Sequence, residues 1–308
     1  MAPVVEKVVE CGDLGEGPHW DAETQTLYFV DIVGHNIHKY VPSTREHTKA
    51  YIGKNVSIII PVKDKSDEFV ITIGREIVRI KWDGESETVT ILEKLYEVEP
   101  DTPHVFNDGK CDPSGRLWAG TLGVASVKDD QFPDEQCNLY SFYNKQVITQ
   151  LSKIGLSNGI AFNTDRKKMY YVDSLKGTLD EFDFDIKNGT ISNGKPIYTL
   201  NAKRGIVDGK VLDGMTIDTE GNLWVAVFNE ARILKIDPRK PETIAGFVEL
   251  PAKQVTSVTF GGPNLDELYV TTGRLAVQGV KPSSPDDGVT YRVTGVNAKG
   301  FPGVRIVL

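Results

Sequence analysis

Two stretches that lie far apart in the chain, D-P-S-G-R-L-W-A-G-T (112–121) and D-T-E-G-N-L-W-V-A-V (218–227), share one layout. Each opens with aspartate, has glycine at its fourth position, and continues through Leu-Trp into a run of small and apolar residues. An acidic turn with glycine before such a run is typical of a tight turn that enters a buried β-strand. The layout therefore predicts a turn-and-strand unit that occurs more than once.

Four further stretches carry the same turn-and-strand unit. They are D-A-E-T-Q-T-L-Y-F-V-D (21–31), D-K-S-D-E-F-V-I-T-I (64–73), N-T-D-R-K-K-M-Y-Y-V-D (163–173) and P-N-L-D-E-L-Y-V-T-T (263–272). When the first apolar residue of each strand is used as a marker, the interval between units runs from 42 residues (Leu27 to Phe69) to 54 residues (Met169 to Leu223). Intervals of this size are typical of the blades of a β-propeller.

Each unit contains more than its marker strand. Runs that alternate apolar and polar residues, such as N-I-H-K-Y-V (36–41) and R-I-L-K-I-D (232–237), follow the marker, and other short runs precede it or fit an outer edge. The sequence thus predicts an all-β fold, a six-bladed β-propeller with four-stranded antiparallel blades, as a single domain over 1–308. An all-β sandwich is the alternative, but it gives no reason for six equivalent units. Either V-V-E-K-V-V-E (4–10) or V-R-I-V-L (304–308) is available to complete the last blade.

Polar residues recur at one phase of the repeat, ten or eleven positions before the marker. They are Glu16, Asn107, Asn158 and Asp213, and Ser57 and Ser257 lie near this phase in the other two units. Glycine follows each of the four within two positions, and glycine permits positive φ or a close approach of the backbone. Recurring Asn-Gly and Asp-Gly turn dipeptides are the simpler alternative. The shared phase favours convergence of the four side chains in the central channel.

The chemistry of this ring points to a cation. Two carboxylates and two amides share the phase, and no histidine or cysteine does. Such a donor set suits one hard divalent cation, Ca²⁺, Mg²⁺ or Mn²⁺, better than a structural zinc. Ca²⁺ is the first choice, and Mg²⁺, Mn²⁺ and Zn²⁺ are the alternatives. The sequence therefore predicts a metal site in the central channel, with Asp108 adding negative charge nearby. An incompletely coordinated cation activates water or polarises a carbonyl, and Asp213 is suited to carry a proton.

Composition limits the partners. A formal net charge of -8 without a Lys/Arg-rich block disfavours nucleic acid, and no run of apolar residues is long enough to span a membrane. The three cysteines (Cys11, Cys111 and Cys137) show no C-x-x-C spacing, which favours a reducing compartment. The first ten residues lack the pattern of a signal peptide. We expect a cytoplasmic protein with a small-molecule substrate that is a monomer or a weak dimer.

Several blocks resemble the regucalcin/gluconolactonase family, also called the senescence marker protein family. They are G-E-G-P-H-W, F-N-D-G-K-C-D-P-S-G-R-L-W-A-G-T, S-N-G-I-A-F-N, L-D-G-M-T-I-D and T-S-V-T-F-G-G-P-N-L-D-E-L-Y-V-T. Together with V-V-E-K near the start, they most resemble the insect luciferin-regenerating members. The resemblance spans essentially the whole chain and implies a six-bladed propeller that binds one divalent cation. It implies Glu16, Asn158 and Asp213 as metal ligands, Asn107 as a substrate-side residue, and Asp213 as the proton donor and acceptor.

Two positions depart from the sugar-lactonase members of the family. Val105 stands where those members carry an arginine that holds substrate hydroxyls, and Ala125 lies near the point where they carry an acidic residue. Both changes favour a more apolar substrate. His104, beside Val105, and His19, beside Glu16, are candidates to line the substrate pocket.

These features predict a metal-dependent hydrolase that acts on oxyluciferin-like heterocycles or lactone-type substrates. A gluconolactonase of broad specificity is the first alternative. A calcium-binding regulatory protein without turnover is the second, and a propeller that only binds partners is the third.

Overall fold

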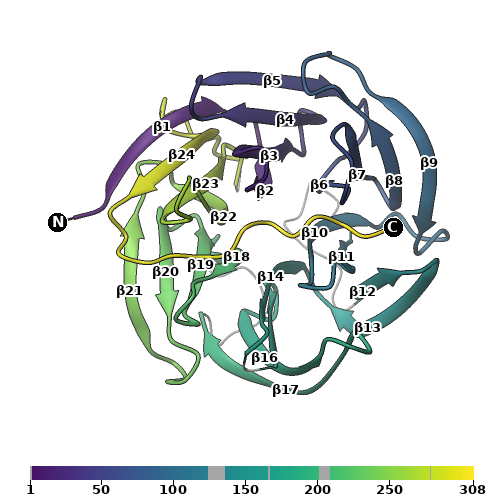
Figure 1. Cartoon of the computed structure of the whole chain (residues 1–308). Helices are drawn as coiled ribbons and strands as arrows, with labels where there is room; N and C mark the ends of the chain where they lie inside the picture. The colour runs from purple at the N-terminus through teal and green to yellow at the C-terminus, as the bar shows by residue number, and fades with distance from the viewer. Residues whose placement is uncertain (1, 124–135, 166, 201–208, 278) are drawn as a thin grey trace.

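The strands of the computed structural model form six four-stranded antiparallel sheets that surround a central channel (Figure 1). The structure describes residues 2–123, 136–165, 167–200, 209–277 and 279–308. In each sheet the innermost strand directly precedes the marker strand identified from sequence and pairs with it. The predicted six-bladed propeller with four-stranded antiparallel blades is confirmed.

The blades follow one another along the chain. Blade 1 has β2 (Gly15–Asp21), β3 (Thr26–Asp31), β4 (Asn36–Val41) and β5 (Glu46–Tyr51). Blade 2 has β6 (Ile59–Pro61), β7 (Glu68–Ile73), β8 (Glu76–Lys81) and β9 (Thr90–Glu97). Blade 3 has β10 (Val105–Cys111), β11 (Leu117–Leu122), β12 (Cys137–Tyr143) and β13 (Gln146–Ile154).

The second half of the ring repeats this order. Blade 4 has β14 (Ser157–Asn163), β15 (Lys168–Asp173), β16 (Thr178–Asp185) and β17 (Thr190–Thr199). Blade 5 has β18 (Val211–Ile217), β19 (Leu223–Phe228), β20 (Arg232–Ile236) and β21 (Ile244–Glu249). Blade 6 has β22 (Gln254–Gly261), β23 (Glu267–Gly273) and β24 (Val289–Thr294), with β1 (Val4–Glu10) as its outer strand.

The apolar core lies between neighbouring blades. Neighbouring blades cover both faces of the second strand of each blade. All six residues of β3 are buried, whereas β9 at an outer edge is largely exposed. Each of the six apolar clusters among the described residues joins residues of two blades, as when Ile58 and Val70 of blade 2 pack with Phe106 and Leu117 of blade 3. This packing holds the inner strands in a ring and fixes the direction of the polar side chains at their ends.

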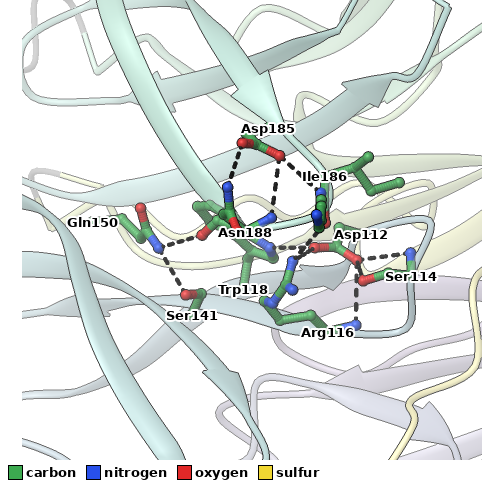
Figure 2. Close-up of polar contacts among 11 residues, drawn as sticks. Asp112, Ser114, Arg116, Trp118, Ser141, Gln150, Asp185, Ile186 and Asn188 are labelled. Carbon is green, nitrogen blue, oxygen red and sulfur yellow. Dashed lines mark hydrogen bonds and ion pairs between the residues drawn. The ribbon is translucent and has the colours of Figure 1, made fainter.

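Asp112 explains the repeated layout of the stretch 112–121. Its side chain is fully buried. Its carboxylate accepts hydrogen bonds from the backbone nitrogen of Ser114 (2.8 Å), from Arg116 Nη1 (2.7 Å) and from Trp118 Nε1 (3.0 Å) (Figure 2). Arg116 Nη1 also donates to the carbonyl oxygen of Ile186 in blade 4, 3.4 Å away. The aspartate thus closes its own turn, anchors the core tryptophan and holds an arginine that ties blade 3 to blade 4.

The stretch 218–227 forms the same arrangement in blade 5. Asp218 accepts from Trp224 Nε1 at 3.0 Å, and Asn222 takes the place of the arginine. Trp118 and Trp224 are 0% and 3% exposed. The two tryptophans are therefore core residues.

The N-terminal strand completes the ring. β1 pairs antiparallel with β24, from Val4 opposite Thr294 to Glu10 opposite Val289. The C-terminal segment instead crosses one end of the channel, as the yellow trace in Figure 1 shows. There the backbone nitrogen of Gly303 donates to the carbonyl of Trp20 (2.8 Å), and that of Ile306 donates to the carbonyl of Pro61 (3.0 Å). Of the two candidate segments, 4–10 closes the propeller and 304–308 covers its end.

Within the described residues, no helix has the length and apolar character needed to cross a membrane.

Candidate functional site

The four polar residues at the shared phase lie at irregularities of the inner strands. In each case the pairing with the marker strand shifts register: between Glu16 and His19, Phe106 and Gly109, Ser157 and Ile160, and Leu212 and Met215. A β-bulge of this kind bends the strand and redirects a side chain. Because all four shifts lie near the same end of the inner strands, opposite the C-terminal segment, they bring the side chains of four blades to one end of the channel.

Glycines make these bulges feasible for two different reasons. Gly17 has a φ of +54°, and a Cβ there would lie 2.9 Å from the carbonyl oxygen of Ser57 in the next blade. Gly159 has no such φ, but a Cβ would lie 2.6 Å from the backbone oxygen of Asp213. Gly17 therefore permits a backbone conformation with positive φ, and Gly159 permits the close approach of blades 4 and 5.

Three carboxylates near this end of the channel interact electrostatically: Glu16, Asp108 and Asp213. Burial, followed by the negative charges of Asp213 and Asp108, raises the pKa of Glu16 well above its usual value. Burial and then Asp108 likewise raise the pKa of Asp213, although a hydrogen bond from the Asn158 side chain opposes the rise. Burial also raises the pKa of Asp108, against the positive charge of Lys110. Such a cluster is costly without a positive counter-charge, because like charges in a buried site repel strongly.

Asn158 supplies the observation that fits a cation. Its Nδ2 donates to Ser174 Oγ at 2.9 Å, but its Oδ1 is buried and has no hydrogen-bond partner. A buried amide oxygen without a partner costs free energy, so it favours a bound donor or a metal ion. This oxygen, beside Glu16 and Asp213, matches the oxygen-rich ligand sets of hard divalent cations. In the part of the chain that is described, no group of three or more His, Cys, Asp or Glu side chains forms a metal centre, so a cation there would depend on the asparagine oxygen.

Asn107 lies at the same end and joins blades 3 and 4. Its Nδ2 donates to the carbonyl oxygen of Ser157 at 2.8 Å, directly before Asn158. Val105, two residues earlier, is partly exposed and pairs with Leu122. The structure thus places an amide and an apolar side chain near the candidate cation site. Ala125 lies outside the described residues.

The two histidines take different places. The ring of His104 is 5% exposed, and its Nδ1 lies 2.5 Å from Glu99 Oε2. Glu99 also accepts from Asn138 Nδ2 (2.6 Å) and Tyr140 Oη (2.8 Å), so this network fixes the loop before β10 to blade 3. His19 lies beyond the bulge, toward the C-terminal segment. A role for His104 in substrate binding remains a prediction.

Two supporting residues went unnoticed in the sequence. Asp31 accepts from the backbone nitrogens of Leu14 (3.1 Å) and Gly34 (3.0 Å), and Asp173 accepts from that of Leu156 (3.2 Å). Each carboxylate ends a marker strand and holds the turn that leads into the site residue of the same blade. The signal was the repeated Val-Asp that ends two of the six marker stretches.

Cation binding is expected to stabilise the protein more at about pH 8 than at about pH 5. The raised pKa values of Glu16 and Asp213 mean that protonation stabilises the cation-free fold, and this contribution is lost as pH rises through those values. Protons and cation compete for the same oxygens. At a CaCl₂ concentration of 100 times the dissociation constant, the gain near pH 8 should approach about 2.7 kcal/mol. Unfolding in CaCl₂ and in EDTA at both pH values measures it, and a gain independent of pH would contradict it.

Comparison with known proteins shows which family the chain belongs to. Residues 14–274 match the model of the SMP-30/Gluconolactonase/LRE-like region. Regucalcin of Xenopus laevis is 35% identical over 303 residues, which cover 96% of this chain and 95% of that protein. A solved luciferin-regenerating enzyme is 45% identical, covers all of both chains and superposes with a TM-score of 0.93. A calcium-binding protein, regucalcin, from Agrobacterium tumefaciens is 23% identical over 100% of this chain and 98% of that one (TM-score 0.82), which supports the fold. The chain belongs to the SMP-30/gluconolactonase/LRE-like family.

Proposed function

We propose that this protein is a divalent-cation-dependent hydrolase of lactone-type or oxyluciferin-like heterocyclic substrates. One observation carries the proposal: the buried carboxylates of Glu16 and Asp213, with the partly buried Asp108, beside the unpartnered Oδ1 of Asn158. The relatives add support, because a luciferin-regenerating enzyme is 45% identical over the whole chain and the family includes gluconolactonases. The apolar Val105 near this site favours an aromatic substrate over a polyhydroxylated sugar lactone.

In this mechanism Glu16, Asn158 and Asp213 would hold the cation, with Ca²⁺ as the first choice. When bound, the cation would polarise the substrate carbonyl and ease ionisation of the attacking water. Asp213, whose pKa is raised by burial and by Asp108, is suited to accept a proton from that water and to return it to the leaving atom, which is the ring oxygen in a lactone and the ring heteroatom bonded to the carbonyl carbon in an oxyluciferin-like heterocycle. Asn107 is placed to orient the substrate.

The test is a hydrolysis panel with the purified full chain. Oxyluciferin, an aromatic lactone and gluconolactone are assayed after treatment with EDTA and again after Ca²⁺, Mg²⁺, Mn²⁺ or Zn²⁺ is added back. Hydrolysis that EDTA abolishes and a cation restores is the expected result, with the aromatic substrates turned over faster. Hydrolysis that is indifferent to EDTA would contradict the role of the cation.

A calcium-binding protein without turnover is the second candidate, because several relatives are named regucalcin. Calorimetry separates the two. Saturable Ca²⁺ binding that Glu16→Gln weakens, together with no hydrolysis across the panel, would favour this candidate over the hydrolase.

We also propose a reducing, cytoplasmic setting and a monomer or weak dimer. Cys11, Cys111 and Cys137 are all buried free thiols, and burial raises the pKa of each of them. Thiols in this state are unreactive and have a packing role.

A further inference from the structure

A second cavity, distinct from the candidate cation site, lies at the end of the channel that the C-terminal segment crosses. Its volume is about 490 Å³, within the range of small-molecule sites. Inner strands of five blades line it, and Phe301, Pro302, Gly303 and Val304 form one side. The trace of the C-terminal segment across the ring marks this end in Figure 1.

This cavity is separate from the candidate cation site. Between the two lies a constriction of about 30 Å³, lined by residues that include Gly17, His19, Asp108 and Lys110. A space of that size admits one or two water molecules and no larger ligand. A small molecule in the second cavity therefore enters from the C-terminal side and does not reach Asp213.

Two polar side chains lie at the inner end of the second cavity. His19 is 8% exposed, and its Nε2 is buried without a hydrogen-bond partner. Burial lowers its pKa to about 4, so the imidazole is neutral at physiological pH and offers either a donor or an acceptor. Lys110 Nζ donates to the carbonyl oxygen of Met215 at 2.7 Å, and an ammonium has three donors in all. These groups suit a ligand with an acceptor at its leading end.

The outer end of the cavity has the opposite character. Asp165 and Glu220 line it and are exposed at the solvent side. Between the two ends Phe162, Ile217 and Val304 supply apolar wall, interspersed with threonines such as Thr216 and Thr259. The polarity therefore changes along the cavity from a cation, through an apolar middle, to two acidic groups.

We propose that this cavity binds a small, elongated aromatic acid whose carboxylate meets Lys110 and His19 and whose far end is neutral or cationic beside Asp165 and Glu220. The apolar middle accepts the ring. A ligand with negative charge at both ends is rejected, because its far end would lie beside the two acidic groups.

Two probes with one ring and opposite far-end charge test this assignment by calorimetry on the full chain. We expect 4-(aminomethyl)benzoate to bind with a dissociation constant of about 1 mM or tighter. Terephthalate, which replaces the ammonium by a carboxylate, should bind at least about tenfold more weakly. Addition of CaCl₂ or EDTA should change neither value.

Variants locate the binding. Phe301→Lys adds a positive charge beside the cavity, so it should weaken 4-(aminomethyl)benzoate about threefold or more and strengthen terephthalate. Phe247→Lys is the matched control, because Phe247 of β21 is 55% exposed, close to the 52% of Phe301, and lies outside the cavity. Lys110→Met should weaken both probes about tenfold.

Three results would overturn the proposal. The first is that 4-(aminomethyl)benzoate does not bind saturably, and the second is that both probes bind equally well. The third is that Phe301→Lys leaves binding of the probe unchanged, whereas Asp213→Asn or EDTA abolishes that binding. This result would place the probe at the candidate cation site. The hydrolysis panel is independent of all three, so the proposed function stands or fails separately.

Discussion

The Asp213→Asn variant is expected to lose between about 10²-fold and 10⁴-fold of kcat at saturating cation, the range that a positioned acid–base group contributes. Asparagine keeps an oxygen that can contact a cation, but it cannot carry a proton. The environment of Asp213 suits this role, since burial and Asp108 raise its pKa toward the range where a carboxylate exchanges protons readily. The measurement is the rate of hydrolysis of the best substrate of the panel as the cation is titrated to saturation.

Glu16→Gln is the matched control for that experiment. It also replaces a buried carboxylate by an amide and removes one negative charge from the same cluster. If Glu16 only binds the cation, this variant should need more cation and then recover most of its kcat. Equal losses of kcat in the two variants at saturating cation would contradict the assignment of proton transfer to Asp213.

The Asp112→Ala variant is expected to be less stable than the parent protein by about 3–5 kcal/mol, the cost of removing one partner of a buried ion pair. Arg116 is 7% exposed and would lose its carboxylate partner, and the indole nitrogen of Trp118 would lose its acceptor. Chemical denaturation monitored by tryptophan fluorescence measures the change in the free energy of unfolding.

Asp185→Ala provides the comparison, because Asp185 lies in the facing turn of blade 4 and is exposed (Figure 2). It accepts from the backbone nitrogens of Lys187 at 2.9 Å and Asn188 at 3.1 Å in contact with solvent, so its loss should cost clearly less stability than the loss of Asp112. A similar cost in both variants would show that the buried aspartate has no special part in joining the turn, the tryptophan and the arginine.

The sequence was informative where a feature repeats. Asp112 with Trp118 and Asp218 with Trp224 carry out the same local task in two blades, so their spacing revealed the blade before any contact was known. Repetition likewise selected Glu16 and its three counterparts. All four residues lie at the same end of the channel. Because they occupy the same position in their blades, they recur at the same phase of the sequence repeat.

Features that occur once could not be derived in this way. The sequence makes segments 4–10 and 304–308 equally available to complete the last blade, and only the three-dimensional structure shows that one pairs with β24 while the other crosses the channel. The bulges also escaped detection, because one extra residue changes which side chain faces the channel without altering composition. His19 lies only three residues from Glu16, yet the bulge between them assigns the two side chains to different ends of the channel.

The pairing of β1 with β24 also has a consequence for biosynthesis. The ribosome makes Val4 about 290 residues before its partner, Thr294. At about 5–20 residues per second, the nascent N-terminus waits roughly a quarter of a minute to one minute for that partner. During this interval β1 has no partner strand, and the edge of the incomplete ring is also unpaired. Chaperones protect unpaired strands in this condition. Completion of the sixth blade therefore waits for the synthesis of β24.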